Sequence, residues 1–180
     1  MVRVLHIGKY YPPFHGGIEN FLRDLTECQL EQGTVEPSIL VHQHEAGRAE
    51  KTETANGVFV RRARILGKAV FTPIAPLFLQ RLNKTVRERD PDILHLHLPN
   101  PSTFWCLLSP RAQKLPWVIH WHSDVLGGGA TWKVKLLYPL YSVFEQALLR
   151  RADAIVVTSP PYLASSAPLE KHRAKCRVIP

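Results

Sequence analysis

The sequence lacks the cysteine patterns of two common classes of small protein. Its three cysteines, Cys28, Cys106 and Cys176, are odd in number and widely spaced, and no CxxC pair occurs. Secreted disulfide scaffolds and structural zinc modules depend on such patterns, so both classes are disfavoured. Unpaired thiols instead favour a reducing compartment.

The chain also lacks a segment with the character of a membrane-spanning helix or a secretion signal. Its longest nearly uncharged stretch, residues 69–79, contains Pro73 and Pro76 and falls well short of the roughly 20 residues of a membrane span. The N-terminus, MVRVLHIG, becomes polar too soon for a signal peptide. We therefore expect a cytoplasmic protein.

Two missing motifs narrow the choice of function further. No GxGxxG fingerprint occurs, which disfavours a nicotinamide-dependent oxidoreductase. No nucleic-acid recognition motif accompanies the scattered basic residues, so nucleic acid is not an expected partner. The formal net charge of +8 favours a phosphorylated small molecule or an anionic membrane surface, although a solvated basic surface fits it equally well.

Short apolar runs alternate with amphipathic stretches along the whole chain. Strands are predicted at residues 2–7, 38–41, 58–63, 93–98, 117–121, 154–158 and 176–179, and helices at residues 17–33, 75–89, 131–151 and 160–165. Uniformly apolar strands alternating with helices are typical of a parallel sheet covered on both faces. We predict an α/β fold with a doubly wound, mainly parallel, Rossmann-like sheet.

In such a sheet, ligands bind beyond the carboxyl ends of the strands. The segment YYPPFHGGIEN, residues 10–20, follows the first strand and contains Gly16 and Gly17, where the predicted helix begins. Glycines permit close approach of a ligand to the backbone, and a helix N-terminus favours phosphate. A tight strand-to-helix turn without a ligand explains the same residues.

Two HxH pairs lie on two of the predicted strands. His95 and His97 share one strand face, and His120 and His122 share another. Zinc is a weak alternative because no third ligand follows at a defined spacing, so we predict no metal. His95 and His120 fit core positions, whereas His122 ends its strand and is placed to donate to a substrate hydroxyl or to stabilise developing charge. Asp124 is the nearest carboxylate that could act as a catalytic nucleophile. The alternative is that Asp124 forms hydrogen bonds that orient its own loop.

The predicted helix at residues 131–151 combines basic and aromatic side chains. Lys133 and Lys135 lie near Trp132, and Arg150 and Arg151 end the helix. This composition fits peripheral contact with a membrane. It also fits a helix that packs on the sheet and exposes a solvated basic face.

Five segments in order resemble the retaining glycosyltransferases of family four. They are YYPPFHGGIEN, PDILHLHLPNP, VIHWHSD, RRADAIVVTSPPYL and CRVIP, and they extend over nearly the whole chain. The resemblance implies one half of a GT-B enzyme, with residues 1–180 as its N-terminal, acceptor-side domain. In the family the chain continues after a VIP-like strand into a second Rossmann-like domain that binds most of the nucleotide. We therefore expect this domain to be absent from residues 1–180.

The resemblance also implies roles for individual residues. Gly16 and Gly17 would lie beside the donor diphosphate and the acceptor, and His122 would contact the transferred sugar. The acceptor side would be lined by Tyr11, His15, Pro99 and Asn100. The family needs no divalent metal. Its mechanism retains the anomeric configuration, with the donor phosphate helping to deprotonate the acceptor hydroxyl.

The sequences of the HWHSD and SPPYL segments resemble those of transferases that build bacterial cell-surface polysaccharides or lipid-linked glycans. This implies a nucleotide-sugar donor, with GDP-mannose as the first expectation, and a glycan or lipid-linked acceptor. Peripheral association with the inner face of the plasma membrane is expected. Residues 1–180 alone are expected not to catalyse sugar transfer. The alternative is a non-enzymatic Rossmann-like module that binds an anion or a membrane surface.

Overall fold

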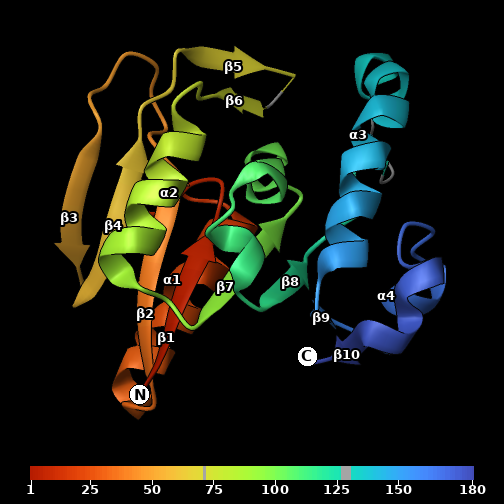
Figure 1. The fold of residues 1–180 in the computed structure, drawn as a ribbon. Coiled ribbons are helices and arrows are strands. Elements are labelled where there is room, and N and C mark those ends of the chain that lie inside the picture. Colours follow the sequence, from red (N-terminus) through yellow and green to blue (C-terminus); the bar gives the residue numbers. More distant parts are fainter. Residues whose placement is uncertain (71, 127–130) are drawn as a thin grey trace.

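The structure, a computed structural model, describes residues 1–70, 72–126 and 131–180. Within these residues an eight-stranded sheet runs in the order β10-β9-β8-β7-β1-β2-β4-β3 (Figure 1). Every neighbouring pair is parallel except β3 and β4. The strands are β1 (Val2–Ile7), β2 (Val35–His42), β3 (Lys51–Ala55), β4 (Val58–Ala63), β7 (Ile93–Leu98), β8 (Trp117–Trp121), β9 (Ala154–Val157) and β10 (Cys176–Val178).

Helices cover both faces of this sheet, as expected for a doubly wound fold (Figure 1). The helices are α1 (Gly17–Gln32), α2 (Phe78–Arg89), α3 (Trp132–Arg151) and α4 (Pro160–Ser165), with 3-10 turns η1 (Pro101–Leu108), η2 (Ala112–Lys114) and η3 (Glu170–Lys175). A separate antiparallel hairpin joins β5 (Gly67–Ala69) to β6 (Thr72–Ile74). Among the described residues, no helix combines the length and apolar content that crossing a bilayer requires.

The predicted α/β fold with a mainly parallel sheet is confirmed, and most predicted boundaries lie within a few residues of those observed. The largest difference is at β2, which begins at Val35 because its ladder with β1 already starts at Val2 opposite Val35. α2 begins at Phe78, three residues later than predicted, since Pro76 interrupts the chain just before it.

Two apolar clusters flank the sheet. On the face that α2 and η1 cover, Leu5 and Ile7 of β1 pack with Phe78 and with Trp117 and Trp121 of β8. On the face that α1 covers, the cluster is smaller and lies over β2 and β4, with buried residues Tyr11, Leu22, Ile39, Val41, Val58 and Val60. The α1 face over β1, β7 and β8 carries histidines instead, so the two faces of the central strands differ in polarity.

The strand order indicates at which point along the sheet a ligand is expected to bind. From β1 the chain proceeds through β2 to β4, and from β7 it proceeds the other way through β8 and β9 to β10. The direction of winding therefore reverses between β1 and β7. In open α/β sheets this switch point opens a crevice beyond the carboxyl ends of the strands.

At the far edge of the sheet, β3 forms a hairpin with β4. β3 was not predicted as a strand. Asn56 and Gly57 connect the two strands with φ values of 49° and 83°, as a tight hairpin turn requires. Glu53 of β3 binds the guanidinium of Arg62, Nε to Oε1 at 2.6 Å, and Arg62 also donates to the carbonyl oxygens of Tyr11 and Pro12. The edge hairpin is thereby connected to the loop after β1.

Candidate active site at the switch point

The loops that follow β1, β7 and β8 meet at the predicted edge. The loop after β1 is held against the end of β2, because the amide of Gly8 donates to Leu40 O at 3.1 Å and the amide of His42 donates to Lys9 O at 3.0 Å. The loop after β8 is held against β7, because the amide of His122 donates to Leu98 O at 3.0 Å. Backbone pairing therefore fixes where the side chains of all three loops begin.

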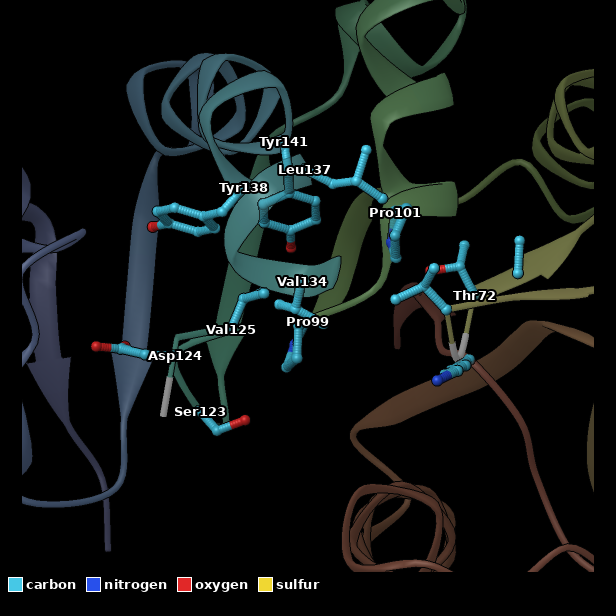
Figure 2. A pocket seen from close by; sticks show the side chains of 13 residues that line it. Thr72, Pro99, Pro101, Ser123, Asp124, Val125, Val134, Leu137, Tyr138 and Tyr141 are labelled. Atoms are coloured by element: carbon cyan, nitrogen blue, oxygen red, sulfur yellow. The ribbon is translucent and has the colours of Figure 1, made fainter. Parts of the chain in front are cut away.

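These loops border a cavity of about 450 Å³, a volume in the range of small-molecule sites (Figure 2). α3 and the β5–β6 hairpin complete its walls. The lining residues are Lys9, Ala69, Val70, Thr72, Pro99, Pro101, Ser123, Asp124, Val125, Val134, Leu137, Tyr138 and Tyr141. Of the predicted site residues, Pro99 and Asp124 are in this set, whereas the others lie elsewhere.

Lys9 is the cation of the cavity wall, and sequence reasoning missed it. It is half-buried, and burial lowers the pKa of its ammonium group; nearby Lys68 lowers this pKa further, while Glu19 opposes the change. Lys9 forms no ion pair with the described residues, so its half-buried ammonium group is suited to bind an anionic ligand. Its position two residues beyond β1 is the signal that could have identified it.

Asp124 anchors the loop after β8. Its Oδ1 accepts hydrogen bonds from Trp121 Nε1 at 2.8 Å, Tyr162 OH at 2.7 Å and Ser166 Oγ at 2.7 Å. These donors come from β8, from α4 and from the residue after α4. Such a saturated oxygen is held in place and is poorly suited to attack a substrate, so the geometry favours the orienting role for Asp124.

α3 contributes a buried carboxyl group behind the cavity. Glu145 is fully buried, Tyr138 OH donates to its Oε2 at 2.9 Å, and its Oε1 has no partner among the described residues. Burial, with a smaller contribution from the negative charge of Asp124, raises the pKa of Glu145 to about 7 although the Tyr138 hydrogen bond opposes the change. Tyr138 and Tyr141, which line the cavity in Figure 2, were not predicted because their helix gave no local sign of a site.

The glycine pair begins α1, as predicted, but the two glycines differ. Gly16 is the N-cap, with an extended backbone, and a Cβ there would collide with Glu19 Oε2. Gly17 is exposed, and a Cβ there would meet no atom within 4 Å. The Glu19 carboxylate thus lies over Gly16 at the positive end of the helix dipole, whereas the space over Gly17 is open.

The remaining predicted acceptor residues are not among those that line the cavity. Tyr11 is only 2 % exposed and packs in the α1-side cluster, so its ring does not line the cavity. His15 is exposed in the first loop. Asn100 is fully buried and caps η1, where its Oδ1 accepts from the amide of Ser102 at 3.2 Å.

His122 lies on the α1 side of the sheet, and it is not among the residues that line the cavity. Its ring packs edge-on against Phe21 of α1, with centroids 5.2 Å apart, and stacks on His120 at 4.3 Å. Burial, with a smaller contribution from the neighbouring His120, lowers the pKa of His122 to about 3, so the ring is neutral at physiological pH. A neutral imidazole offers one donor and one acceptor to a substrate hydroxyl.

Histidine nitrogens also cluster closely enough to be considered as metal ligands. One group comprises His6, His95 and His97, and the other comprises His97, His120 and His122, each with ligand atoms within 4.8 Å of one another. Metal ligation needs the lone pairs of the rings to converge in their planes. His120 and His122 instead stack with an interplanar angle of 12°, and His95 and His97 with 26°. Activity without a metal stays a prediction.

Comparison with known proteins identifies the family. Residues 16–180 match the family described as glycosyl transferase 4-like domain. The chain is 33 % identical to the O-antigen chain mannosyltransferase C of Escherichia coli over 184 residues, which cover 99 % of this chain and 45 % of that protein. The chain therefore spans less than half the length of this relative.

Solved structures support the same fold at lower identity. Sucrose-phosphate synthase from Thermosynechococcus elongatus matches 100 % of this chain and 48 % of its own, with a TM-score of 0.69 and 17 % identity. A UDP complex of MnaA from S. aureus matches 99 % of this chain and 43 % of its own, with a TM-score of 0.56 and 13 % identity. The sheet described above is therefore one half of a GT-B architecture, and the chain belongs to the glycosyl transferase 4-like family.

Proposed function

We propose that the intact protein transfers a hexose, with mannose as the first candidate, from a nucleotide sugar to a glycan or lipid-linked acceptor with retention. The observation that carries this proposal is the identity of 33 % with a mannosyltransferase over almost the entire chain. The name of this relative, O-antigen chain mannosyltransferase C, supports both mannose and a surface-polysaccharide acceptor. GDP-mannose is accordingly the first donor to test.

The geometry of the switch point supports this chemistry. Lys9 supplies a half-buried cation at the cavity wall, and the open N-terminus of α1 at Gly17 supplies unpaired amides, so both favour a diphosphate. We expect the donor phosphate to help deprotonate the acceptor hydroxyl, which attacks the anomeric carbon from the same face of the sugar that the nucleoside diphosphate leaves. His122 contacts the transferred sugar, while Asp124 holds its loop. The acceptor enters along Pro99 and the cavity wall of α3.

We further propose that residues 1–180 form the acceptor-side domain and that residues outside this range bind most of the nucleotide. The chain accounts for 45 % of the length of its mannosyltransferase relative, which leaves room for a second domain in such a protein. A transferase needs both halves to enclose the donor and exclude water. The 180-residue chain is therefore expected to show no transfer when it is purified alone.

The test is a transfer assay with the intact protein, GDP-mannose or competing nucleotide sugars, and a panel of lipid-linked and soluble glycans. We expect mannose transfer from GDP-mannose, an α-mannoside in the product by NMR, and full activity after treatment with a chelator. Residues 1–180 assayed in parallel should be inactive. A β-mannoside, metal dependence or turnover by the 180-residue chain would each contradict the corresponding part of the proposal.

A membrane-bound acceptor would require the enzyme to reach the bilayer, and α3 carries a surface suited to this. Trp132, Leu136 and Leu140 follow one another at intervals of four residues and are 69 %, 69 % and 66 % exposed. Lys133 and Lys135 lie on the same turns. Exposed apolar side chains beside lysines bind anionic interfaces through combined burial and charge attraction. We propose that α3 contacts an anionic membrane surface on the cytoplasmic side.

Flotation with vesicles tests this contact. The intact protein should float with vesicles of phosphatidylglycerol and phosphatidylethanolamine at low salt, and binding should fall sharply when Trp132, Leu136 and Leu140 are all replaced by serine. Leu108→Ser is a matched control, because Leu108 is 64 % exposed but lies on η1. If the triple variant binds as the wild type does, another surface contacts the vesicles and the proposal for α3 is wrong. Vesicle binding without transfer from any nucleotide sugar would favour the non-enzymatic alternative.

A further inference from the structure

Five histidines form a layer on the α1 face of the three central strands. His6 of β1 lies opposite His95 of β7 in the ladder, and His97 lies opposite His120 of β8. His122 continues the layer at the end of β8. Such positions in a parallel sheet are usually filled by Val, Ile or Leu. Polar rings at buried positions therefore call for an explanation in terms of hydrogen bonds.

Hydrogen bonds connect three of these rings in series and join them to α1. Gln29 Oε1 lies 2.9 Å from His6 Nε2, His6 Nδ1 lies 3.2 Å from His97 Nε2, and His97 Nδ1 lies 3.1 Å from His122 Nε2. Each internal ring uses both of its nitrogens. The series therefore runs from the last turn of α1, across β1 and β7, to the residue that follows β8.

The ring geometry is that of genuine N–H···N bonds. For His97 and His122 the centroids are 5.4 Å apart and the planes differ by 19°, so the centroid separation exceeds the nitrogen–nitrogen distance by about the two ring radii. The bond therefore points along the ring centres, where the N–H and the lone pair lie. His6 and His97 show nearly the same relation, with centroids 5.5 Å apart.

The series also has a direction. The oxygen of Gln29 only accepts, so His6 must carry its proton on Nε2 and accept at Nδ1. His97 must then donate from Nε2 and accept at Nδ1, and His122 must donate from Nε2. Because burial lowers the pKa of His6 to about 4 and that of His97 well below its ordinary value, the rings are neutral and this pattern persists at physiological pH. His122 is left with an unprotonated Nδ1.

We propose that Gln29, His6 and His97 are positioning residues that hold His122 in the Nε2-protonated tautomer, so that its Nδ1 accepts a hydrogen bond from a hydroxyl of the bound sugar or acceptor. This inference rests on the proposed transferase function for its last step only. The tautomer itself is a property of the protein without substrate. For histidines that bind a metal, loss of the hydrogen-bond partner that orients the ring typically costs about 10- to 100-fold in affinity or activity, and we expect an effect at the lower end of this range here.

Substitution of Gln29 tests the proposal, because three hydrogen bonds in series separate this residue from His122. Gln29→Glu keeps an acceptor and should preserve the tautomer and kcat. Gln29→Lys offers only donors, so it should reverse the series, place the proton of His122 on Nδ1 and lower kcat about tenfold. Gln29 is only partly buried on α1, so these changes are compatible with folding. Gln32→Lys, one turn further along α1 and exposed, is the matched control and should change neither quantity.

The readouts are ring nitrogen chemical shifts of His122 in the intact protein labelled with ¹⁵N-histidine, and kcat in the mannosyl transfer assay. Resonances are assigned by their loss in His122→Asn. A wild-type His122 protonated on Nδ1, or a tautomer that does not change in Gln29→Lys, would overturn the relay. A reversed tautomer with unchanged kcat would overturn its role in the reaction. If the wild type transfers no sugar, the proposed function fails, while the shifts still decide the relay.

Discussion

Replacing Glu145 with glutamine is expected to stabilise the protein above pH 7 by about 2–3 kcal/mol. Burial raises the pKa of the Glu145 carboxyl from its ordinary 4.5 to about 7. Between these two values the folded chain binds more protons than the unfolded chain, so the free energy of unfolding falls as the pH rises. Above pH 7 the folded protein holds a buried carboxylate with one partner, the Tyr138 hydroxyl, among the described residues. Glutamine removes that charge.

The measurement is urea unfolding of wild type and variant at several pH values from 4.5 to 8. The two chains should be equally stable near pH 4.5, and the advantage of Glu145→Gln should grow up to pH 7 and then level off. The histidines titrate in both chains, so the difference isolates Glu145. Glu31→Gln, at an exposed position on α1, serves as the control for the removal of one carboxylate. A constant offset at every pH would contradict the raised pKa.

Gly17→Ala is expected to lower kcat/KM of the intact enzyme about a hundredfold, which is the usual consequence of displacing a reacting group by about 1 Å. The open space over Gly17 at the start of α1 is where we place the donor diphosphate, and a methyl group there would keep it from the helix amides. Alanine is otherwise acceptable at this exposed first position of a helix. The variant should therefore fold with unchanged or slightly higher stability.

Gly16→Ala is the matched comparison, because its added Cβ meets the Glu19 carboxylate and not the ligand space. It should cost about 1 kcal/mol by displacing an acid from the helix N-terminus. Kinetics over a range of GDP-mannose concentrations and thermal unfolding of both variants give the required values. If Gly17→Ala had the same kcat/KM as the wild type, the diphosphate would not bind over Gly17, and the proposed position would be wrong.

Much of the fold could be predicted because each central strand is a short run of mostly apolar residues between polar loops. The strands at residues 93–98 and 117–121 were predicted with their observed boundaries. β3 was missed because its sequence KTETA has no apolar face, and it becomes a strand only by pairing with β4 across the Asn56–Gly57 turn. η1 was missed since PSTFWCLL has no helical periodicity. Strand pairing with β4 decides the first segment, and packing against α2 and α3 accompanies the second.

The candidate site could be located from the sequence but not assembled. Loop positions after strands identified the correct edge, and Pro99 and Asp124 do line its cavity. The contact between His6 and His97 spans 91 positions in the sequence and depends on the register of β1 against β7, which no local pattern specifies. The walls contributed by α3 depend likewise on how that helix packs.

The hairpin of β3 and β4 has a consequence for how these molecules behave at high concentration. An unpaired sheet edge is a template on which another chain can add a strand. β3 closes this edge with only five residues, alternates Lys51 and Glu53 with threonines, and is held down by the Arg62 ion pair. Short charged strands of this kind discourage edge-to-edge polymerisation, so we expect concentrated protein to resist fibril formation from this side. Neutralising Lys51 and Glu53 together would remove that protection.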